Sequence, residues 1–210
     1  MSGEIRVVND GSRDATDQVA RAAAALDSRI VIQKELHRGK GGAVRAGILT
    51  SRARRRLLCD ADLSVPIPEL HKLLGCILAG ADIAIGCRES PGARRVGEPR
   101  RRHWMGRAFN GLVRQLTRVS FPDTQCGFKL FTAAAAEAVF RHLTIDGWAF
   151  DVEALVLAEH LKYRVDVVPV TWIYSADSRV SPIRDAARMA LDVAHIRRKT
   201  KRGDYGRRIS

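Results

Sequence analysis

The chain has 210 residues, of which 46% are hydrophobic and 28% charged, a composition typical of a globular domain with a real hydrophobic core and not of a disordered chain. Its longest charge-free stretch is far shorter than the roughly 20 residues of a membrane-spanning helix, and no apolar signal-peptide core is present. The formal net charge of +13 suits a polyanionic partner: nucleic acid, an anionic lipid surface or a phosphorylated substrate.

The excess positive charge is concentrated in three stretches. Residues 52–56 carry four arginines, residues 94–107 carry six arginines and one glutamate, and residues 197–210 carry seven basic residues and one aspartate. Composition alone does not choose among the possible polyanions. The four cysteines form no CxxC pair or zinc spacing, so we expect reduced, mostly buried thiols of a cytosolic protein.

Short β-branched runs alternate along the chain with Ala- and Leu-rich runs, a pattern that predicts an α/β domain with a mostly parallel sheet flanked by helices. The expected strands are 5–8, 29–33, 56–59, 82–86 and 165–174, with an extended segment at 125–131. The expected helices are 15–26, 43–51, 69–78, 103–118, 133–141, 150–161 and 183–198, with a mobile loop at 92–99 and a loose basic tail over the last dozen residues.

Four polar clusters directly follow predicted strands. They are Asn9-Asp10, the loop 38–42, Asp60 with Asp62, and Arg88. In an open parallel sheet the carboxyl ends of the strands share one rim, where ligands bind. The coincidence predicts a ligand site at this rim.

Asp60-Ala61-Asp62 is the strongest motif. Two carboxylates one residue apart at a strand end can hold a hard divalent cation such as Mg²⁺ or Mn²⁺, whose other positions go to phosphate oxygens. A solvated loop or a helix cap is the alternative for an isolated DxD. The apolar strand 56–59, which directly precedes this DxD motif, favours the metal site.

Two neighbouring motifs are less specific. Asn9-Asp10-Gly11-Ser12 is either a turn that starts a helix or a site where Asp10 accepts hydrogen bonds from a nucleotide. The glycine-rich loop with Lys40 is not a Walker loop, because no GK[ST] ends it. It is either a plain loop or a backbone cradle for a phosphate.

The arginines offer bidentate phosphate contacts, although most of them are expected to form only a solvated basic surface. Arg88 is the exception, because it lies at the predicted rim. Two further blocks, DTQCGFKLF at 123–131 and WAFDVEAL at 148–155, mix apolar and polar residues in a way that no helix or strand period explains. Core packing with one or two exposed charges is the alternative for both.

Five blocks together carry a resemblance. NDGSRDAT, RGKGGAVRAGI, CDADLSVP, DTQCGFKLF and WAFDVEAL occur here in the order and spacing of the inverting family-2 glycosyltransferases. Within that family the chain most resembles the dolichyl-phosphate glucosyltransferases and other polyprenyl-phosphate sugar synthases, over about residues 3–182. The resemblance implies a GT-A-like fold, a nucleotide-sugar donor, a divalent metal at the DxD and a polyprenyl-phosphate acceptor at a membrane.

The resemblance also implies roles for individual residues. Asp10, Lys40 and Asp60 would contact the nucleotide sugar, and Asp62, with Asp60, would hold the metal. Arg179 would lie over the donor diphosphate. Arg88 and Arg102 would face the acceptor phosphate, and Asp151 occupies the region where relatives with hydroxyl acceptors keep a catalytic base.

The chain departs from the family pattern in two places. The family begins with a strand and a Pro-Ala-Tyr-Asn-Glu-like motif some forty residues before the NDGS block, and this sequence starts almost at that block. Ser64 also replaces a glutamine that mannose-transferring relatives carry, which weakens a mannose reading.

The sequence therefore predicts an enzyme that transfers a sugar, with UDP-glucose as the expected donor, to a polyprenyl or dolichyl phosphate with inversion. A basic nucleic-acid-binding protein and an inactive truncated transferase are the alternatives. We expect no nucleic-acid partner, because Trp104 alone is interleaved with the arginines of 94–107. The expected organisation is a GT-A-like domain at 1–182, then an amphipathic helix and basic tail at 183–210 that hold the enzyme on an anionic membrane surface at the cytoplasmic face.

Overall fold

The computed structural model describes residues 3–174 and 184–205, apart from the side chains of 100–102 and 184–187. The strands are β1 (Ile5–Asn9), β2 (Ile30–Lys34), β3 (Arg55–Cys59), β4 (Ile83–Cys87), β5 (Arg94–Val96), β6 (Phe128–Thr132), β7 (Val165–Pro169) and β8 (Thr171–Ile173). The α-helices are α1 (Thr16–Leu26), α2 (Lys40–Thr50), α3 (Leu70–Leu78), α4 (Arg100–Thr117), α5 (Ala133–His142), α6 (Phe150–His160) and α7 (Arg184–Arg202).

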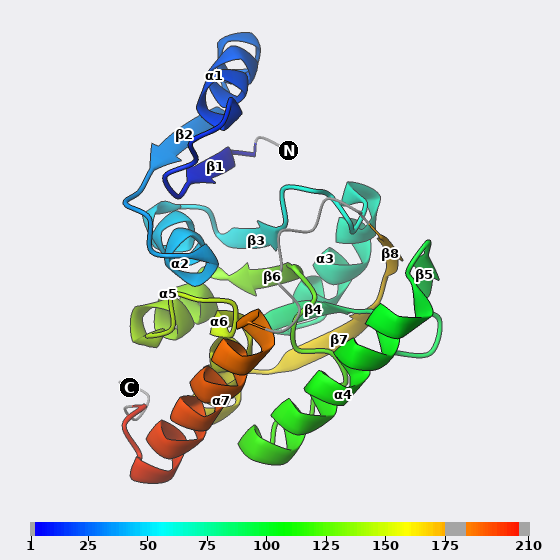
Figure 1. The fold of residues 1–210 in the computed structure, drawn as a ribbon. Coiled ribbons are helices and arrows are strands. Elements are labelled where there is room, and N and C mark those ends of the chain that lie inside the picture. The colour runs from blue at the N-terminus through cyan, green and yellow to red at the C-terminus, as the bar shows by residue number, and fades with distance from the viewer. Residues whose placement is uncertain (1–2, 175–183, 206–210) are drawn as a thin grey trace.

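A four-stranded sheet of order β3-β6-β4-β7 forms the centre of the fold (Figure 1). β6 is antiparallel to both β3 and β4, whereas β4 and β7 are parallel. Three of the four strands therefore run in one direction, and their carboxyl ends reach the same edge of the sheet. This confirms the predicted α/β class with a mostly parallel sheet.

Two hydrophobic cores cover the two faces of this sheet. Residues of β4 alternate between them: Ile83 and Ile85 pack with α5, α6 and α7, whereas Ala84 packs on the α3 side. The same period of two in β6 places Phe131 on the α6 side and Leu130 on the α3 side. Helices on both faces bury the sheet, which explains why β4 is apolar along its whole length.

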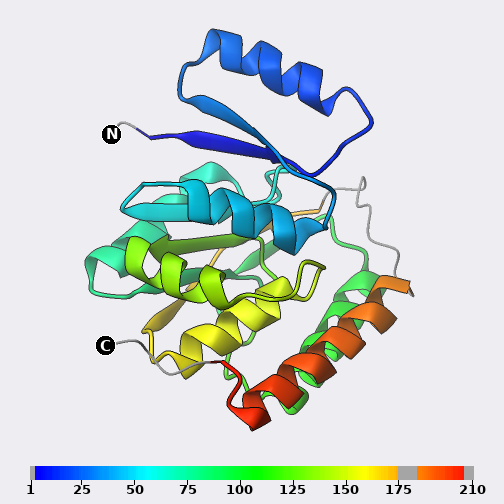
Figure 2. The ribbon, with the colours of Figure 1, turned by 90° about the vertical axis from the view of Figure 1, so that its left-hand side faces the viewer.

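The strands β1 and β2 form a separate parallel pair, visible with α1 above the central sheet in Figure 2. Helix α2 packs against both β1 and β3. Within the described residues β1 and β3 are not hydrogen-bonded to each other. The described strands therefore form three separate sheets, β1-β2, β3-β6-β4-β7 and β5-β8.

Several sequence-based boundaries were wrong. Helix α2 begins at Lys40, inside the predicted loop, because Gly39 turns the chain with a φ of +119°. The predicted mobile loop 92–99 contains β5, which pairs in parallel with β8. The predicted strand 165–174 divides after Pro169, where β7 stays in the central sheet and β8 turns to β5.

The predicted loose tail was also wrong in its first half. Helix α7 continues to Arg202, and Tyr205 is only 1% exposed. The period of the apolar residues predicts the helix itself. Tyr205, just after the helix, is buried because its hydroxyl bonds to Glu153, and such a contact with a distant segment leaves no local signal in the sequence.

Candidate active site

Asp10 organises the glycine loop. Its two carboxylate oxygens accept hydrogen bonds from the backbone amides of Arg38 and Gly39, both at 2.9 Å, and Nδ1 of His37 lies 3.0 Å from Oδ2. The strand end of β1 is thereby joined to the start of α2. The structure brings together two motifs that the sequence separates by nearly thirty residues.

The glycines of this loop are required by the close approach of residues 144–147. A Cβ on Gly39 would lie 2.6 Å from the carbonyl oxygen of Asp146, and one on Gly41 would lie 2.5 Å from the carbonyl oxygen of Ile145. The amides of Gly41 and Gly42 donate to the Asp146 carbonyl at 2.8 and 3.2 Å. These bonds satisfy amides of the first turn of α2, which the helix itself cannot pair.

Asp60 and Asp62 lie in a tight turn after β3. Leu63 has a left-handed φ of +50°, and its amide donates to the Asp60 carbonyl at 3.1 Å. Such a conformation is rare for leucine, and strained backbone of this kind gathers at functional sites. A Cβ at Gly127 would lie 2.0 Å from Oδ2 of Asp60, so only glycine leaves room for that carboxylate.

Lys40 reaches from the glycine loop to this turn. Its ammonium lies 2.7 Å from Oδ1 of Asp60 and 5.3 Å from the centre of the Trp148 ring. Burial opposes its charge, but the carboxylates of Asp60 and Asp151 outweigh burial and raise the pKa of Lys40. Lys40 is therefore a fixed cation at the DxD turn.

Asp151, in the first turn of α6, is 3% exposed. Its Oδ1 is 2.5 Å from Nζ of Lys129, which also donates to the Cys126 carbonyl at 2.7 Å. Burial raises the pKa of Asp151 despite the neighbouring Lys129. Asp151 is therefore a buried carboxylate held by an ion pair.

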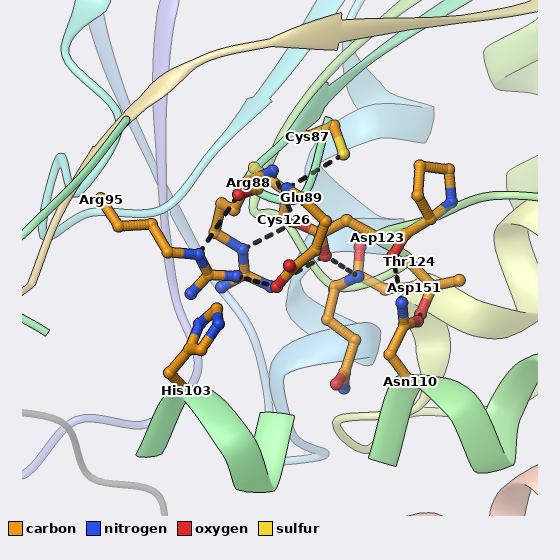
Figure 3. A network of polar contacts seen from close by, with 12 residues as sticks. Cys87, Arg88, Glu89, Arg95, His103, Asn110, Asp123, Thr124, Cys126 and Asp151 are labelled. Carbon is orange, nitrogen blue, oxygen red and sulfur yellow. Dashed lines mark hydrogen bonds and ion pairs between the residues drawn. The ribbon is translucent and has the colours of Figure 1, made fainter. Parts of the chain in front are cut away.

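Arg88, at the end of β4, forms a bidentate ion pair with Asp123. Its Nε and Nη2 donate to the two carboxylate oxygens at 2.7 and 2.9 Å, and its amide donates at 3.0 Å (Figure 3). Burial opposes ionisation of Asp123, but Arg88 overcomes it and lowers the pKa of Asp123 to about 2. The guanidinium also lies 5.6 Å from the Trp172 ring centre, so its orientation is fixed.

A second arginine extends this network (Figure 3). Arg95 pairs with Glu89 and with Glu98, and Nδ1 of His103 lies 3.3 Å from Oε2 of Glu98. The Arg95 guanidinium lies 5.8 Å from the ring centre of Trp172. Within the segment that joins β4 to α4, Arg88 and Arg95 are thus held by ion pairs, whereas Arg94 is exposed.

The structure places Asp10, Lys40, Asp60, Asp62 and Asp151 around one strand-end region. Arg88 belongs to the neighbouring Asp123 network. The side chain of Arg102 is not described, and Arg179 lies outside the described residues. Sequence reasoning missed the partners that hold these residues, and only the two aperiodic blocks gave a signal: Asp123 and Lys129 lie in DTQCGFKLF, and Glu153 lies in WAFDVEAL.

The two DxD carboxylates suit a divalent cation that is shared with a ligand. Within 3–174 and 184–205 no three acidic, histidine or cysteine side chains form a metal-holding group. Asp62 is exposed, and its Oδ1 accepts only the amide of Ser64 at 3.0 Å in the described contacts. Oxygen donors of this type are those that Mg²⁺ and Mn²⁺ prefer, with phosphate oxygens completing the shell.

The fold and this arrangement agree with the comparison to protein families. The family described as Glycosyl transferase family 2 matches residues 3–140, and the chain belongs to it. The sequence-based recognition is confirmed. Among curated relatives, dolichyl-phosphate beta-glucosyltransferases are 37% identical in Drosophila melanogaster and 35% in Homo sapiens, each across 92% of this chain. The chain spans 62% and 63% of the length of those two proteins.

Solved structures support the fold. Glucosyl-3-phosphoglycerate synthase from Mycobacterium tuberculosis, in complex with Mn²⁺, uridine diphosphate and glucosyl-3-phosphoglycerate, is 14% identical with a TM-score of 0.63, and covers 92% of this chain and 67% of its own. Mannosyl-3-phosphoglycerate synthase from Rubrobacter xylanophilus is 20% identical with a TM-score of 0.57, and covers 96% and 64% respectively. At these identities the likeness concerns the fold alone.

Proposed function

We propose that this protein transfers glucose from UDP-glucose to a polyprenyl phosphate, of which dolichyl phosphate is the type, and forms a lipid-linked monosaccharide with inversion. The observation that carries the proposal is the DxD turn beside Lys40, at the strand ends of a family-2 chain. The glucosyltransferase names of the relatives that match across 92% of this chain support glucose as the sugar.

The reaction is a single displacement at the anomeric carbon. An oxygen of the acceptor phosphate forms a bond to C1 of glucose while the bond from C1 to the diphosphate breaks, and UDP leaves with the electron pair. A phosphate monoester is largely dianionic at pH 7. The nucleophile therefore needs positioning more than a base, which agrees with the burial of Asp151 against Lys129.

On the donor side, the loop that Asp10 organises receives the nucleotide, and Lys40 faces its diphosphate. Arg179, outside the described residues, is assigned to the same diphosphate by the family resemblance alone. Asp62, with Asp60, would hold Mg²⁺ or Mn²⁺. A divalent cation there supplies stabilisation of the charge that develops on the departing diphosphate. Mn²⁺ in the complex of the mycobacterial synthase supports this choice of metal.

On the acceptor side, Arg88 and Arg102 bind the lipid phosphate. The ion pair with Asp123 and the Trp172 ring hold the Arg88 guanidinium in one orientation. Asp151 is assigned an electrostatic part in catalysis, because its charge acts on Lys40.

The acceptor lipid requires the protein to work at a membrane surface. No helix in the described part of the chain has the length and apolar character to span a bilayer. The basic stretches 94–107 and 197–210 would attract anionic headgroups at the cytoplasmic face, at about 1 kcal/mol per basic residue near the surface. Liposome binding should therefore need anionic lipid and weaken with salt.

The proposal is tested by incubating the protein with radiolabelled UDP-glucose, Mn²⁺ and dolichyl phosphate in detergent, and counting label in the organic phase. UDP-galactose and GDP-mannose serve as competing donors. Transfer from UDP-glucose above the other donors supports the proposal. Label that stays in the aqueous phase with every donor contradicts it.

The rival function, nucleic-acid binding, explains the charge of +13 but gives no role to the DxD turn. Family membership favours the enzyme. Salt-sensitive binding of single-stranded RNA or DNA with no sugar transfer would favour the rival.

A further inference from the structure

A cavity of about 1220 Å³ lies beside the glycine loop, and helix α7 forms one of its walls. Residues 10–13, 37–40 and 144–148 line the opposite side. Positions 188, 192, 195 and 199 of α7 share one helix face, because they are spaced by three or four residues. From the sequence, this helix and the tail after it are expected to bind an anionic membrane surface.

The apolar face of α7 is already used within the protein. Val193 is 1% exposed and Ile196 is fully buried, and both belong to the core that includes α5 and α6. α7 also packs against α4. The polar face is therefore held toward the cavity.

The described side chains that line the cavity favour an anionic ligand. The lining carries more cations than acids: Arg13, Arg38, Lys40, Arg188 and Lys199 against Asp10, Asp146 and Asp192. The charge of Asp10 is already compensated, because its carboxylate accepts hydrogen bonds from two backbone amides.

Glu153 fixes the position of α7. This carboxylate is fully buried, and it accepts hydrogen bonds from the amides of Thr144 and Ile145 at 2.8 and 2.7 Å. It also accepts from the Thr144 hydroxyl at 2.6 Å and from the Tyr205 hydroxyl at 2.9 Å. A buried charge needs such partners, so the segment after α7 and the loop 144–145 are bound to one group.

The connection continues to the glycine loop. Lys199 donates to the Thr144 hydroxyl at 3.1 Å and lies 4.7 Å from the ring centre of Tyr205. The loop that begins at Thr144 leads directly to Asp146, whose carbonyl accepts the amides of Gly41 and Gly42. A continuous set of contacts thus runs from the end of α7 to the start of α2.

We propose that α7 is a wall of the donor site. Arg188 contributes a cation to binding of the nucleoside-diphosphate sugar, and Glu153 is a positioning residue that holds α7 and the glycine loop as two sides of one pocket. The proposal rests on the proposed function, because it takes its ligand from there.

The first test removes one hydroxyl. In Tyr205→Phe the ring stays and the bond to Glu153 is lost, so we expect UDP-glucose with Mn²⁺ to bind about fivefold more weakly in calorimetric titration. Tyr163→Phe is the matched control, because its hydroxyl makes a 3.4 Å bond to the Ala134 carbonyl on the surface. Melting curves accompany each titration. A lower melting temperature with an unchanged Kd would mean that Tyr205 is structural only and would overturn the positioning role.

The second test removes the exposed cation. Arg188→Ala should weaken UDP-glucose binding about tenfold, because a charge-assisted bond to the diphosphate is lost. Arg141→Ala, an exposed arginine on α5, is the control. Absence of binding to the unaltered protein overturns the proposed function and this inference with it. Binding that neither Arg188→Ala nor Tyr205→Phe weakens overturns the inference alone.

Discussion

Five carboxylates around the candidate site form two groups that differ in exposure and in partners. Asp62 is exposed and Asp60 partly so, in a strained turn after β3. Asp123, Asp151 and Glu153 are at most 4% exposed. Each of the buried three is held by a cation or by several donors, whereas the pair in the turn keeps oxygen atoms that can reach a ligand.

The difference follows from the free energy of burying charge. A carboxylate leaves water only when hydrogen bonds or an opposite charge replace its hydration. The buried group therefore holds the surrounding structure in place, and the proposed function assigns the metal to the exposed pair. Substitutions of the buried carboxylates should lower stability, and substitutions of the exposed pair should lower activity without lowering stability.

The largest expected effect is on activity. Asp62→Asn removes a carboxylate assigned to the metal, which is worth several kcal/mol of transition-state stabilisation, so sugar transfer should fall about a thousandfold. Removal of divalent metal by EDTA should have a similar effect on the unaltered protein. Asp166→Asn, an ion-paired aspartate on β7, is the control. Full transfer by Asp62→Asn would show that the exposed pair is not the metal site.

The next effect is on stability. Asp123→Asn leaves Arg88 without its ionised partner in a buried site, which should lower the free energy of unfolding by about 3 kcal/mol in urea titrations. The double variant Arg88→Met with Asp123→Leu should recover most of that loss, because no uncompensated charge remains. If Asp123→Asn lowers the free energy of unfolding by less than about 1 kcal/mol, Asp123 behaves like an exposed carboxylate and the comparison fails for this residue.

The same ion pair predicts a pH dependence. The pKa of Asp123 is lowered to about 2 in the folded protein, from about 3.9 in an unfolded chain. Its stabilisation is therefore complete above about pH 5 and is lost as the pH falls through the folded pKa, on the order of 2 kcal/mol in all. Unfolding free energies measured from pH 6 to pH 2 should show this loss in the natural sequence, and a clearly smaller one in the Arg88→Met, Asp123→Leu double variant.

The smallest effect is expected at an exposed pair. Arg141 lies 3.0 Å from Glu137 on α5, with its side chain 71% exposed. Arg141→Ala should change the free energy of unfolding by less than about 0.5 kcal/mol, because water and salt screen such pairs. A change above 1 kcal/mol would weaken the link between exposure and stability on which the comparison depends.

Membrane binding by the basic tail is best tested with variants that keep the bond from Tyr205 to Glu153. Deleting residues 197–210 would remove both the basic charges and the bond from Tyr205 to Glu153. Replacing Arg197, Arg198 and Lys201 by glutamine alters charge alone and keeps the hydroxyl in place. Loss of binding to anionic liposomes in that variant would locate the contact there, and unchanged binding would move it to residues 94–107.

The sequence predicts the site where chemistry follows a strand end. Asp10, Asp60 and Arg88 each come directly after a short apolar run. The ends of β3 and β4 lie at one edge of the central sheet, and Asp10 is linked to that edge through the glycine loop, whose Lys40 contacts Asp60. Lys129 and Glu153 could not be placed in the same way. Lys129 lies within an apolar strand, and its role depends on the side of β6 that faces α6. Tyr205 finds Glu153 across more than fifty residues, a distance over which no local pattern acts.

We propose that this rim transfers a sugar to a lipid phosphate in one displacement. The most direct measurement is the anomeric configuration of the product made from UDP-α-glucose and dolichyl phosphate, determined by proton NMR on the purified lipid. We expect a β-linked glucosyl phosphate, because one displacement inverts the α-configured donor. An α-linked product, or free glucose with no lipid-linked sugar, would contradict it.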